Sequence, residues 1–160
     1  MILDNQKYIQ HFFRKRRGLT NFELEKLLAD DDEFVGCFSQ DNLPTKLNLP
    51  ATIIINTAKR SSKGRHWIAI RIQKNSSLYF DTFGVHPVED NIKTFLQRFS
   101  KKILYSVVCI QDINSFYCGF YCFAFIKMVK NVKSFKTFLD FFYPFASKKN
   151  DKIVKTILEQ

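Results

Sequence analysis

The stretch "GRHWIAIRI", Gly64 to Ile72, decides how the middle of this chain folds. Every second residue toward its end is an isoleucine, the period-2 pattern of a β-strand with one apolar face. The isoleucines of that face are Ile68, Ile70 and Ile72. The polar turn "KNSS" at 74–77 and the apolar run "LYFDTF" at 78–83 come next. Strand, turn and strand together predict an antiparallel hairpin.

The mouth of this hairpin holds His66, one of three histidines, beside Trp67, the only tryptophan. Two interpretations compete for the pair. In the first, both residues pack against the core. In the second, His66 is half of a catalytic pair, and the rest of the chain must then supply its partners.

The remaining patterns predict an α+β domain with a short sheet and one deeply buried helix. Apolar residues at helical spacing, or an almost wholly apolar run, predict helices at 21–29, 88–102, 118–131, 134–142 and 150–160. Apolar, β-branched runs predict strands at 51–58 and 103–110, and polar or proline-containing segments predict loops at 34–50 and 111–117. A chain of 160 residues suits one domain, residues 1–160.

The charge balance indicates contact with a polyanion. The net charge is +10, and the basic residues occur in groups. These groups are Arg14–Arg17; Lys59, Arg60, Lys63 and Arg65; and Lys127, Lys130, Lys133 and Lys136. Such clusters favour DNA or another nucleic acid, and solubility explains them equally well. The chain has neither a glycine-rich phosphate loop nor zinc-finger spacing, so sequence-specific reading of DNA has no support.

The N-terminal segment and the length of the apolar runs indicate where in the cell the protein is expected. No apolar run approaches the ~20 residues that span a bilayer, so we expect no membrane partner. In "MILDNQKYIQHFFRKRRG" the charges follow the apolar residues, which is the wrong order for a secretory signal. We therefore expect an intracellular protein or one carried inside a particle.

The four cysteines, Cys37, Cys109, Cys118 and Cys122, form no C-x-x-C pair and have no histidine at zinc-ligand spacing. We therefore expect thiols rather than a metal site. Cys118 follows a polar loop and begins the apolar helix, whose positive end favours a reactive thiolate. Gly119 leaves room there for a substrate backbone. Taken alone, Cys118 is also explained as a packed cysteine at a helix start, and Cys122 as an inert core thiol.

Other residues supply partners for Cys118. The hairpin brings His66 and Asp81 to the same edge of the sheet, where the carboxylate can fix the histidine tautomer. Gln111 lies seven residues before Cys118 and can donate its amide to an oxyanion, together with the Cys118 backbone N–H. Asp112 is the alternative acid. This set of residues predicts nucleophilic cysteine catalysis.

Four separated blocks resemble one family. "FVGCFSQDNLP", "IIINTAKRSSKGRHWIAI", "LYFDTFG" and "QDINSFYCGFYC" are similar to blocks of adenovirus-type (adenain-like) cysteine proteases, especially those of Polinton/Maverick elements and related viruses. The resemblance runs from about Thr20 to Met128. It implies a papain-like or adenain-like α+β fold, in which a short mixed sheet covers a buried central helix that carries the nucleophile.

The resemblance also implies roles. His66 matches the catalytic histidine, Asp81 the acidic member, Gln111 the oxyanion-hole glutamine and Cys118 the nucleophile. Trp67 matches a tryptophan that shapes the substrate cleft. The acidic member is Glu in adenain and Asp in many relatives.

The implied function is a cysteine endopeptidase that cleaves capsid or virion precursor proteins of a virus or transposon, in the host nucleus or cytoplasm and in the virion. One alternative is a deconjugase for ubiquitin-like proteins, because those enzymes share the His-Trp and Gln…Cys-Gly blocks. The other is a non-enzymatic, basic nucleic-acid-binding module on the same scaffold.

The family prototype is activated by viral DNA and by a short viral peptide, which is disulfide-linked to a cysteine about eleven residues before the glutamine. Here Ser100 stands at that place, and Cys109 lies only two residues before Gln111. We expect no metal or organic cofactor, and activation by DNA or by a viral peptide stays open.

Overall fold

The structure is a computed structural model that describes residues 2–160. Its helices are α1 (Ile2–Arg14), α2 (Asn21–Leu27), α3 (Asp90–Phe99), α4 (Cys118–Met128), α5 (Val132–Asp140) and α6 (Lys148–Leu158). Its strands are β1 (Phe34–Ser39), β2 (Ala51–Asn56), β3 (Trp67–Gln73), β4 (Asn75–Phe80) and β5 (Ser100–Tyr105). The described chain is therefore of mixed α+β class. Along these residues, no helix is both long and apolar enough to cross a membrane.

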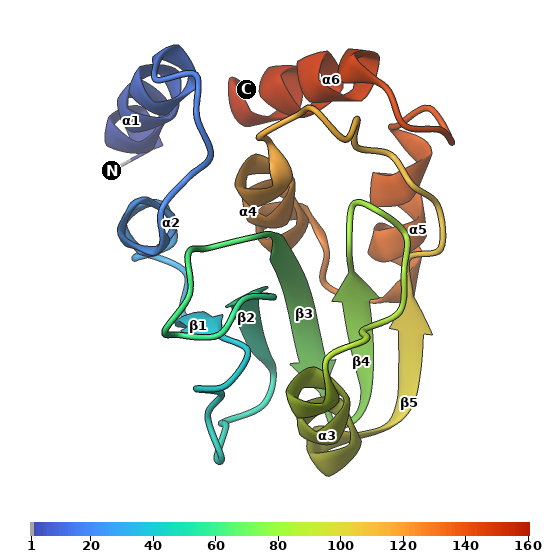
Figure 1. The fold of residues 1–160 in the computed structure, drawn as a ribbon. Coiled ribbons are helices and arrows are strands. Elements are labelled where there is room, and N and C mark those ends of the chain that lie inside the picture. The colour runs from blue at the N-terminus through green and yellow to red at the C-terminus, as the bar shows by residue number, and fades with distance from the viewer. Residues whose placement is uncertain (1) are drawn as a thin grey trace.

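The strands form one mixed sheet in the order β1-β2-β3-β4-β5 (Figure 1). The two outer pairs are parallel, and the inner pairs β2/β3 and β3/β4 are antiparallel. β2 therefore has a neighbouring strand on each edge, and an apolar core covers each of its faces. It is consequently buried at every residue. Sequence analysis predicted a short sheet and a buried helix, and both are present.

The predicted hairpin is formed by β3 and β4, with Ala69 opposite Phe80 and Gln73 opposite Ser76. Its turn is tighter than predicted, because Asn75 adopts a positive φ of 64° and pairing resumes immediately. Asparagine tolerates that backbone region better than most residues. The second strand therefore runs over 75–80 rather than 78–83, and Asp81 is the first residue beyond it.

Each face of the sheet has its own apolar core. The predicted isoleucine face, with Ile68, Ile70 and Ile72, packs against Ile92 and Phe95 of α3. The opposite face packs against α4, whose residues Gly119–Ile126 are all buried. A helix enclosed by a sheet and by other helices has no solvent face, so its sequence is apolar all round.

Two elements were missed. β1 lies within the segment 34–50 that was predicted to be a loop, and it pairs in parallel with β2. Its glycine and mixed burial give no alternation to recognise. α1 was not predicted either, although its Phe13 is buried and stacks on Phe120 of α4 with ring centroids 4.5 Å apart. The predicted strand 103–110 also ends early, at Tyr105.

Asn150, at the start of α6, is fully buried and ties three chain segments together. Its Nδ2 donates to the carbonyls of Ile110, Tyr143 and Phe145, and its Oδ1 accepts from the Tyr143 N–H. We predict that Asn150→Leu lowers the free energy of unfolding by about 2–4 kcal/mol, because it leaves buried backbone groups without partners.

Chemical denaturation measures this loss. The control is Lys149→Leu on the exposed neighbouring position, with an expected change within about 0.5 kcal/mol. Equal losses in the two variants would contradict the role given to Asn150.

Candidate active site

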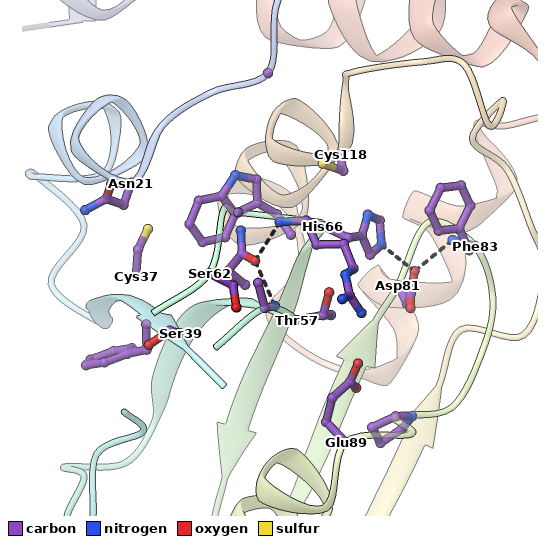
Figure 2. A pocket seen from close by; sticks show the side chains of 18 of the residues that line it. Asn21, Cys37, Ser39, Thr57, Ser62, His66, Asp81, Phe83, Glu89 and Cys118 are labelled. Atoms are coloured by element: carbon purple, nitrogen blue, oxygen red, sulfur yellow. Dashed lines mark hydrogen bonds and ion pairs between the residues drawn. The ribbon is translucent and has the colours of Figure 1, made fainter. Parts of the chain in front are cut away.

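A cavity of about 1080 Å³ opens where the sheet meets the beginning of α4. Its walls come from five segments: 18–21, the ends of β1 and β2, the loop before β3, the loop 83–89 and the segment 111–118. His66, Trp67, Asp81, Gln111 and Cys118 all line it. Figure 2 shows His66 with Asp81 and Phe83 on one side and Cys118 close by. The structure thus gathers these five predicted site residues around one cavity.

His66 and Asp81 lie on the same edge of the hairpin, as expected. His66 Nε2 is 2.9 Å from Asp81 Oδ1, and the same oxygen accepts from the Phe83 N–H at 2.8 Å. Asp81 is 4% exposed, and its backbone N–H donates to the Ser106 hydroxyl. The carboxylate is therefore fixed from several sides, and it leaves Nδ1 of His66 for another partner.

The His66 ring is held by stacking as well as by hydrogen bonding. It lies against Phe83 with ring centroids 4.5 Å apart and an interplanar angle of 26°. Burial lowers the pKa of His66, but hydrogen bonds to Asp81 and Cys118 and their negative charges outweigh it and raise the pKa to about 9. The imidazole is therefore protonated at neutral pH, between a carboxylate and a sulfur.

Cys118 is the first residue of α4. Tyr117 stands at the N-cap position before it, and the Tyr117 side chain makes no capping hydrogen bond to the helix. The positive end of the helix is therefore directed at the thiol. Burial raises the pKa of the thiols of Cys37, Cys109 and Cys122. Those three remain neutral thiols at neutral pH.

Gln111 is 1% exposed, and the turn that follows β4 sets its orientation. Its Oε1 accepts from the Thr82 hydroxyl at 2.5 Å, and its Nε2 donates to the Ser115 carbonyl at 3.0 Å. The amide oxygen is thereby turned toward Thr82. The amide nitrogen is turned toward the segment that leads to Cys118. Asp112, the alternative acid, accepts instead from the Asn114 N–H within its own loop.

The turn Asp81–Gly84 lies in the block "LYFDTFG", of which the sequence assigned a role to Asp81 alone. Asp81 contacts the histidine, Thr82 contacts Gln111, and Phe83 stacks on the histidine. Gly84 has φ +66°, and a Cβ there would lie 2.4 Å from the carbonyl carbon of Val108. The signal in the sequence was "DTFG" directly after a strand, since a glycine there allows a left-handed turn.

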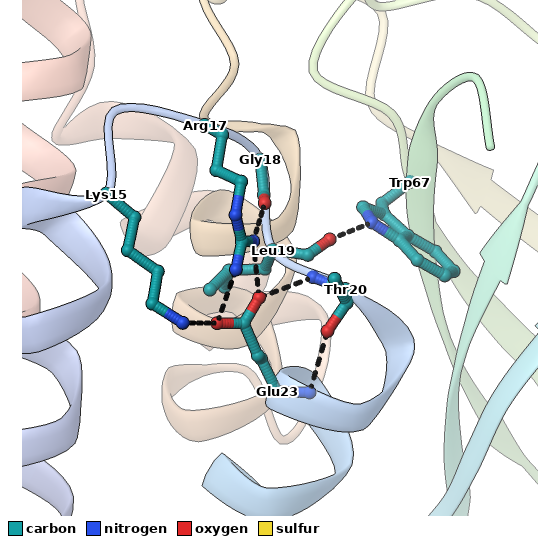
Figure 3. A network of polar contacts seen from close by, with 7 residues as sticks. All are labelled: Lys15, Arg17, Gly18, Leu19, Thr20, Glu23 and Trp67. Atoms are coloured by element: carbon teal, nitrogen blue, oxygen red, sulfur yellow. Dashed lines mark hydrogen bonds and ion pairs between the residues drawn. The ribbon is translucent and has the colours of Figure 1, made fainter. Parts of the chain in front are cut away.

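A second feature that the sequence did not reveal is a strap, residues 15–20, between α1 and α2 (Figure 3). The carboxylate of Glu23 binds Arg17 Nη1 at 2.6 Å and the Thr20 N–H at 3.0 Å. Burial would raise the pKa of Glu23, but these bonds lower it to about 2. The Leu19 carbonyl accepts from Trp67 Nε1 at 2.9 Å. The strap is therefore fixed as one wall of the cavity.

Gly119 provides room for this strap. It is buried, and a Cβ there would lie 3.1 Å from Leu19 Cβ and 3.3 Å from Trp67 Cδ1. Trp67 lines the cavity, whereas Gly119 lies beneath the Leu19 and Trp67 side chains. Tight packing of the strap on the first turn of α4 thus requires a glycine next to Cys118.

Ser100 and Cys109 are the two positions that bear on a disulfide-linked peptide activator. Ser100 is buried and shares a hydrogen bond with Ser77, and the Cys109 thiol points to the Gln111 carbonyl at 3.6 Å. Within residues 2–160, no group of three or more His, Cys, Asp or Glu is arranged to hold a metal ion.

The sequence matches no family profile and has no significant match among curated proteins. Its fold, however, is similar to that of the ASFV pS273R protease in its selenomethionine crystal structure. The TM-score is 0.54 and the sequence identity 17%, over 90% of this chain and 68% of that protein. The chain therefore has a protease-like fold.

Substitution of Gly84 tests the importance of the turn Asp81–Gly84 for stability. We predict that Gly84→Ala lowers the free energy of unfolding by about 2–4 kcal/mol, the sum of a left-handed backbone penalty and a steric clash with Val108. The matched control is Gly18→Ala, where the nearest atom, the Phe116 carbonyl oxygen, would be 3.5 Å away. Chemical denaturation of both variants measures the difference, and equal stabilities would refute the constraint.

Proposed function

We propose that this protein is an adenain-like cysteine endopeptidase of a virus or virus-like transposon, with residues 1–160 as one protease domain. The observation that carries the proposal is His66, which is hydrogen-bonded to Asp81 at the wall of a large cavity that Cys118 also lines. The protease-like fold supports it. This arrangement of residue types suits acyl transfer through a thiolate.

The first half of the proposed reaction forms a thioester. The Cys118 sulfur attacks the carbonyl carbon of the scissile peptide bond, and the carbonyl oxygen becomes an oxyanion. One Nε2 hydrogen of Gln111 is used on Ser115, so the second can donate to that oxyanion. The Cys118 backbone N–H is the other donor. Protonated His66 then gives its Nδ1 proton to the leaving amine.

The second half releases the product. Neutral His66 accepts a proton from water, and the resulting hydroxide attacks the thioester carbonyl. The acid leaves, and the Cys118 thiolate and the His66 imidazolium re-form. Throughout, Asp81 keeps Nε2 protonated and stabilises the imidazolium.

The proposed substrates are capsid or virion precursor proteins, and the proposed setting is the nucleus or cytoplasm of the host cell and the virion. The basic groups support stimulation by DNA as a further proposal. Activation by a viral peptide would have to be non-covalent at position 100, because that residue is a buried serine.

The test of this function is selective alkylation followed by hydrolysis. At about pH 6, iodoacetamide should label Cys118 at least about tenfold faster than Cys37 or Cys109, because an ion-paired thiolate reacts and a neutral thiol does not. His66→Ala should abolish the difference. Hydrolysis of a denatured protein mixture by the wild type, but not by Cys118→Ser, then establishes a peptidase. Peptide mass mapping measures both.

The alternatives give different results. Equal, slow labelling of all cysteines in the presence of DNA would support the non-enzymatic module. Cleavage of a ubiquitin-like reporter without cleavage of other proteins would support the deconjugase.

The pKa of His66 also sets the pH range of activity. The group acts in its protonated form, and its pKa is raised to about 9, so activity persists above 6.5 and falls as the pH rises through about 9. We predict that kcat/KM, measured between about pH 6 and 10, has its descending limb near pH 9. A descending limb near 6.5, the usual pKa of histidine, would contradict the pairing of His66 with Asp81 and Cys118.

A further inference from the structure

A group of basic residues borders the same cavity as Cys118. The loop of residues 59–65, here the basic loop, connects β2 to β3, and its Lys59, Arg60 and Arg65 line the cavity. Figure 2 shows Ser62 of this loop between Cys37 on one side and His66 on the other. A ligand bound in this cavity therefore lies near these cations as well as near Cys118.

The basic loop has a fixed base. The buried Asn56 accepts from the Ala58 N–H at 2.9 Å and the Arg65 N–H at 3.0 Å through one oxygen, Oδ1. At the other side of the loop, Asp41 Oδ1 accepts from the Arg60 N–H at 2.7 Å. These bonds hold the backbone, so the arginine side chains extend from defined positions rather than from a disordered segment.

The carboxylate nearest the basic loop is that of Asp41, which accepts from the Arg60 N–H and whose pKa is lowered mainly by that bond and in part by the charge of Lys59, but it forms no ion pair with the loop. None of the ion pairs among residues 2–160 includes Lys59, Arg60, Lys63 or Arg65. Besides Asp81, which is paired with His66, the cavity lining contains one carboxylate, that of Glu89. This wall consequently attracts an anionic group, and the long arginine side chains can bind a carboxylate through two N–H groups.

We propose that the basic loop selects substrates with an acidic side chain close to the scissile bond, bound by Arg60 and Arg65. The inference rests on the proposed peptidase function and names its substrate class: a protein segment with Asp or Glu near the cut. An extended peptide advances about 3.4 Å per residue, so a residue a few positions from the scissile bond can reach another part of the same cavity wall.

An acidic peptide fits this wall better than a nucleic acid does. Single-stranded nucleic acids are bound by aromatic rings that stack on bases. The basic loop consists of Lys, Arg, Ser and Gly and offers no such ring, and two aromatic rings of the same cavity are already engaged, Trp67 by the Leu19 carbonyl and Phe83 by His66. Its cations also line the cavity that holds the nucleophile, where a polypeptide must lie for the proposed reaction to occur.

The experiment is the digestion of a peptide library, derived from a whole proteome, by wild-type protein. We expect Asp and Glu to be enriched at one or two positions near the cut. A cleaved peptide and its Glu→Gln or Asp→Asn partner should differ about five- to tenfold in kcat/KM at about 50 mM salt, and less at high salt. The variant Arg60→Gln/Arg65→Gln should remove that difference. Lys101→Gln/Lys102→Gln, at two exposed positions of the edge strand β5, should keep it.

A second measurement needs no substrate. Iodoacetate is anionic and iodoacetamide neutral, so the ratio of their labelling rates at Cys118 reports the positive potential of the cavity. That ratio should fall about threefold in Arg60→Gln/Arg65→Gln and stay unchanged in the lysine control.

The outcomes separate this inference from the proposed function. Cleavage without acidic enrichment, or with an enrichment that survives in the arginine variant, overturns the inference and leaves the peptidase intact. Inhibition by a single-stranded oligonucleotide that depends on the two arginines, without acidic enrichment, assigns the basic loop to nucleic acid instead. If no peptide is cleaved, the peptidase fails, and an unchanged labelling ratio overturns the electrostatic basis as well.

Discussion

The geometry of the site depends on the backbone of one turn, Asp81–Gly84, at the end of β4. Successive residues of this turn hold His66 and Gln111, which come from different segments of the cavity wall. The left-handed conformation of Gly84 lets the turn pack directly on the backbone of Val108 and Cys109, and the Thr82 carbonyl accepts the N–H groups of Ile110 and Gln111. The positions of His66 and of Gln111 are therefore coupled through one turn, by the buried side chains of Asp81 and Thr82 and by the main-chain hydrogen bonds of Thr82. Preorganised donors of this kind do not have to reorganise when charge develops on a substrate.

The sheet and α4 supply the rigid frame for that turn. β3 is buried on both faces, with Ile68, Ile70 and Ile72 on one face, so a register shift of one residue would move the buried Arg71 into the isoleucine core. The register then fixes how far Asp81 lies from His66, because the two residues stand just beyond paired strand ends. α4 packs on the opposite face from α3, and its first residue is Cys118. His66 and Asp81 thus come from the β3/β4 hairpin and Cys118 from α4, and core packing sets the position of the hairpin relative to the helix.

The sequence predicted the parts of this arrangement that repeat, and missed those that depend on single partners. Alternating isoleucines revealed the hairpin, and an apolar run revealed α4, because burial imposes a period or a composition on many residues at once. His66, Asp81, Gln111 and Cys118 were identified because each stands at the edge of such an element. The strap was not predicted, since it depends on Glu23 meeting Arg17 and on Trp67 meeting Leu19, and such contacts leave no pattern along the chain. β1 was missed because Gly36 interrupts the alternation of its residues. α1 was missed because its polar residues obscure the apolar side that packs on α4.

Electrostatics connect the proposed chemistry with the proposed selectivity. With Cys118 as a thiolate, the charges of Asp81, His66 and Cys118 sum to one negative charge in a partly buried site. Cys118, at the positive end of α4, and the cations of the basic loop line the same cavity as that charge. Arg65 directly precedes His66, so the backbone that positions the histidine also positions a cation at the cavity wall. A substrate carboxylate that binds the arginines would be drawn in by the same field that favours the thiolate, and it would partly neutralise that field. An acid too close to the scissile bond would then weaken the nucleophile's ion pair, which argues for recognition at a position removed from the cut rather than directly beside it.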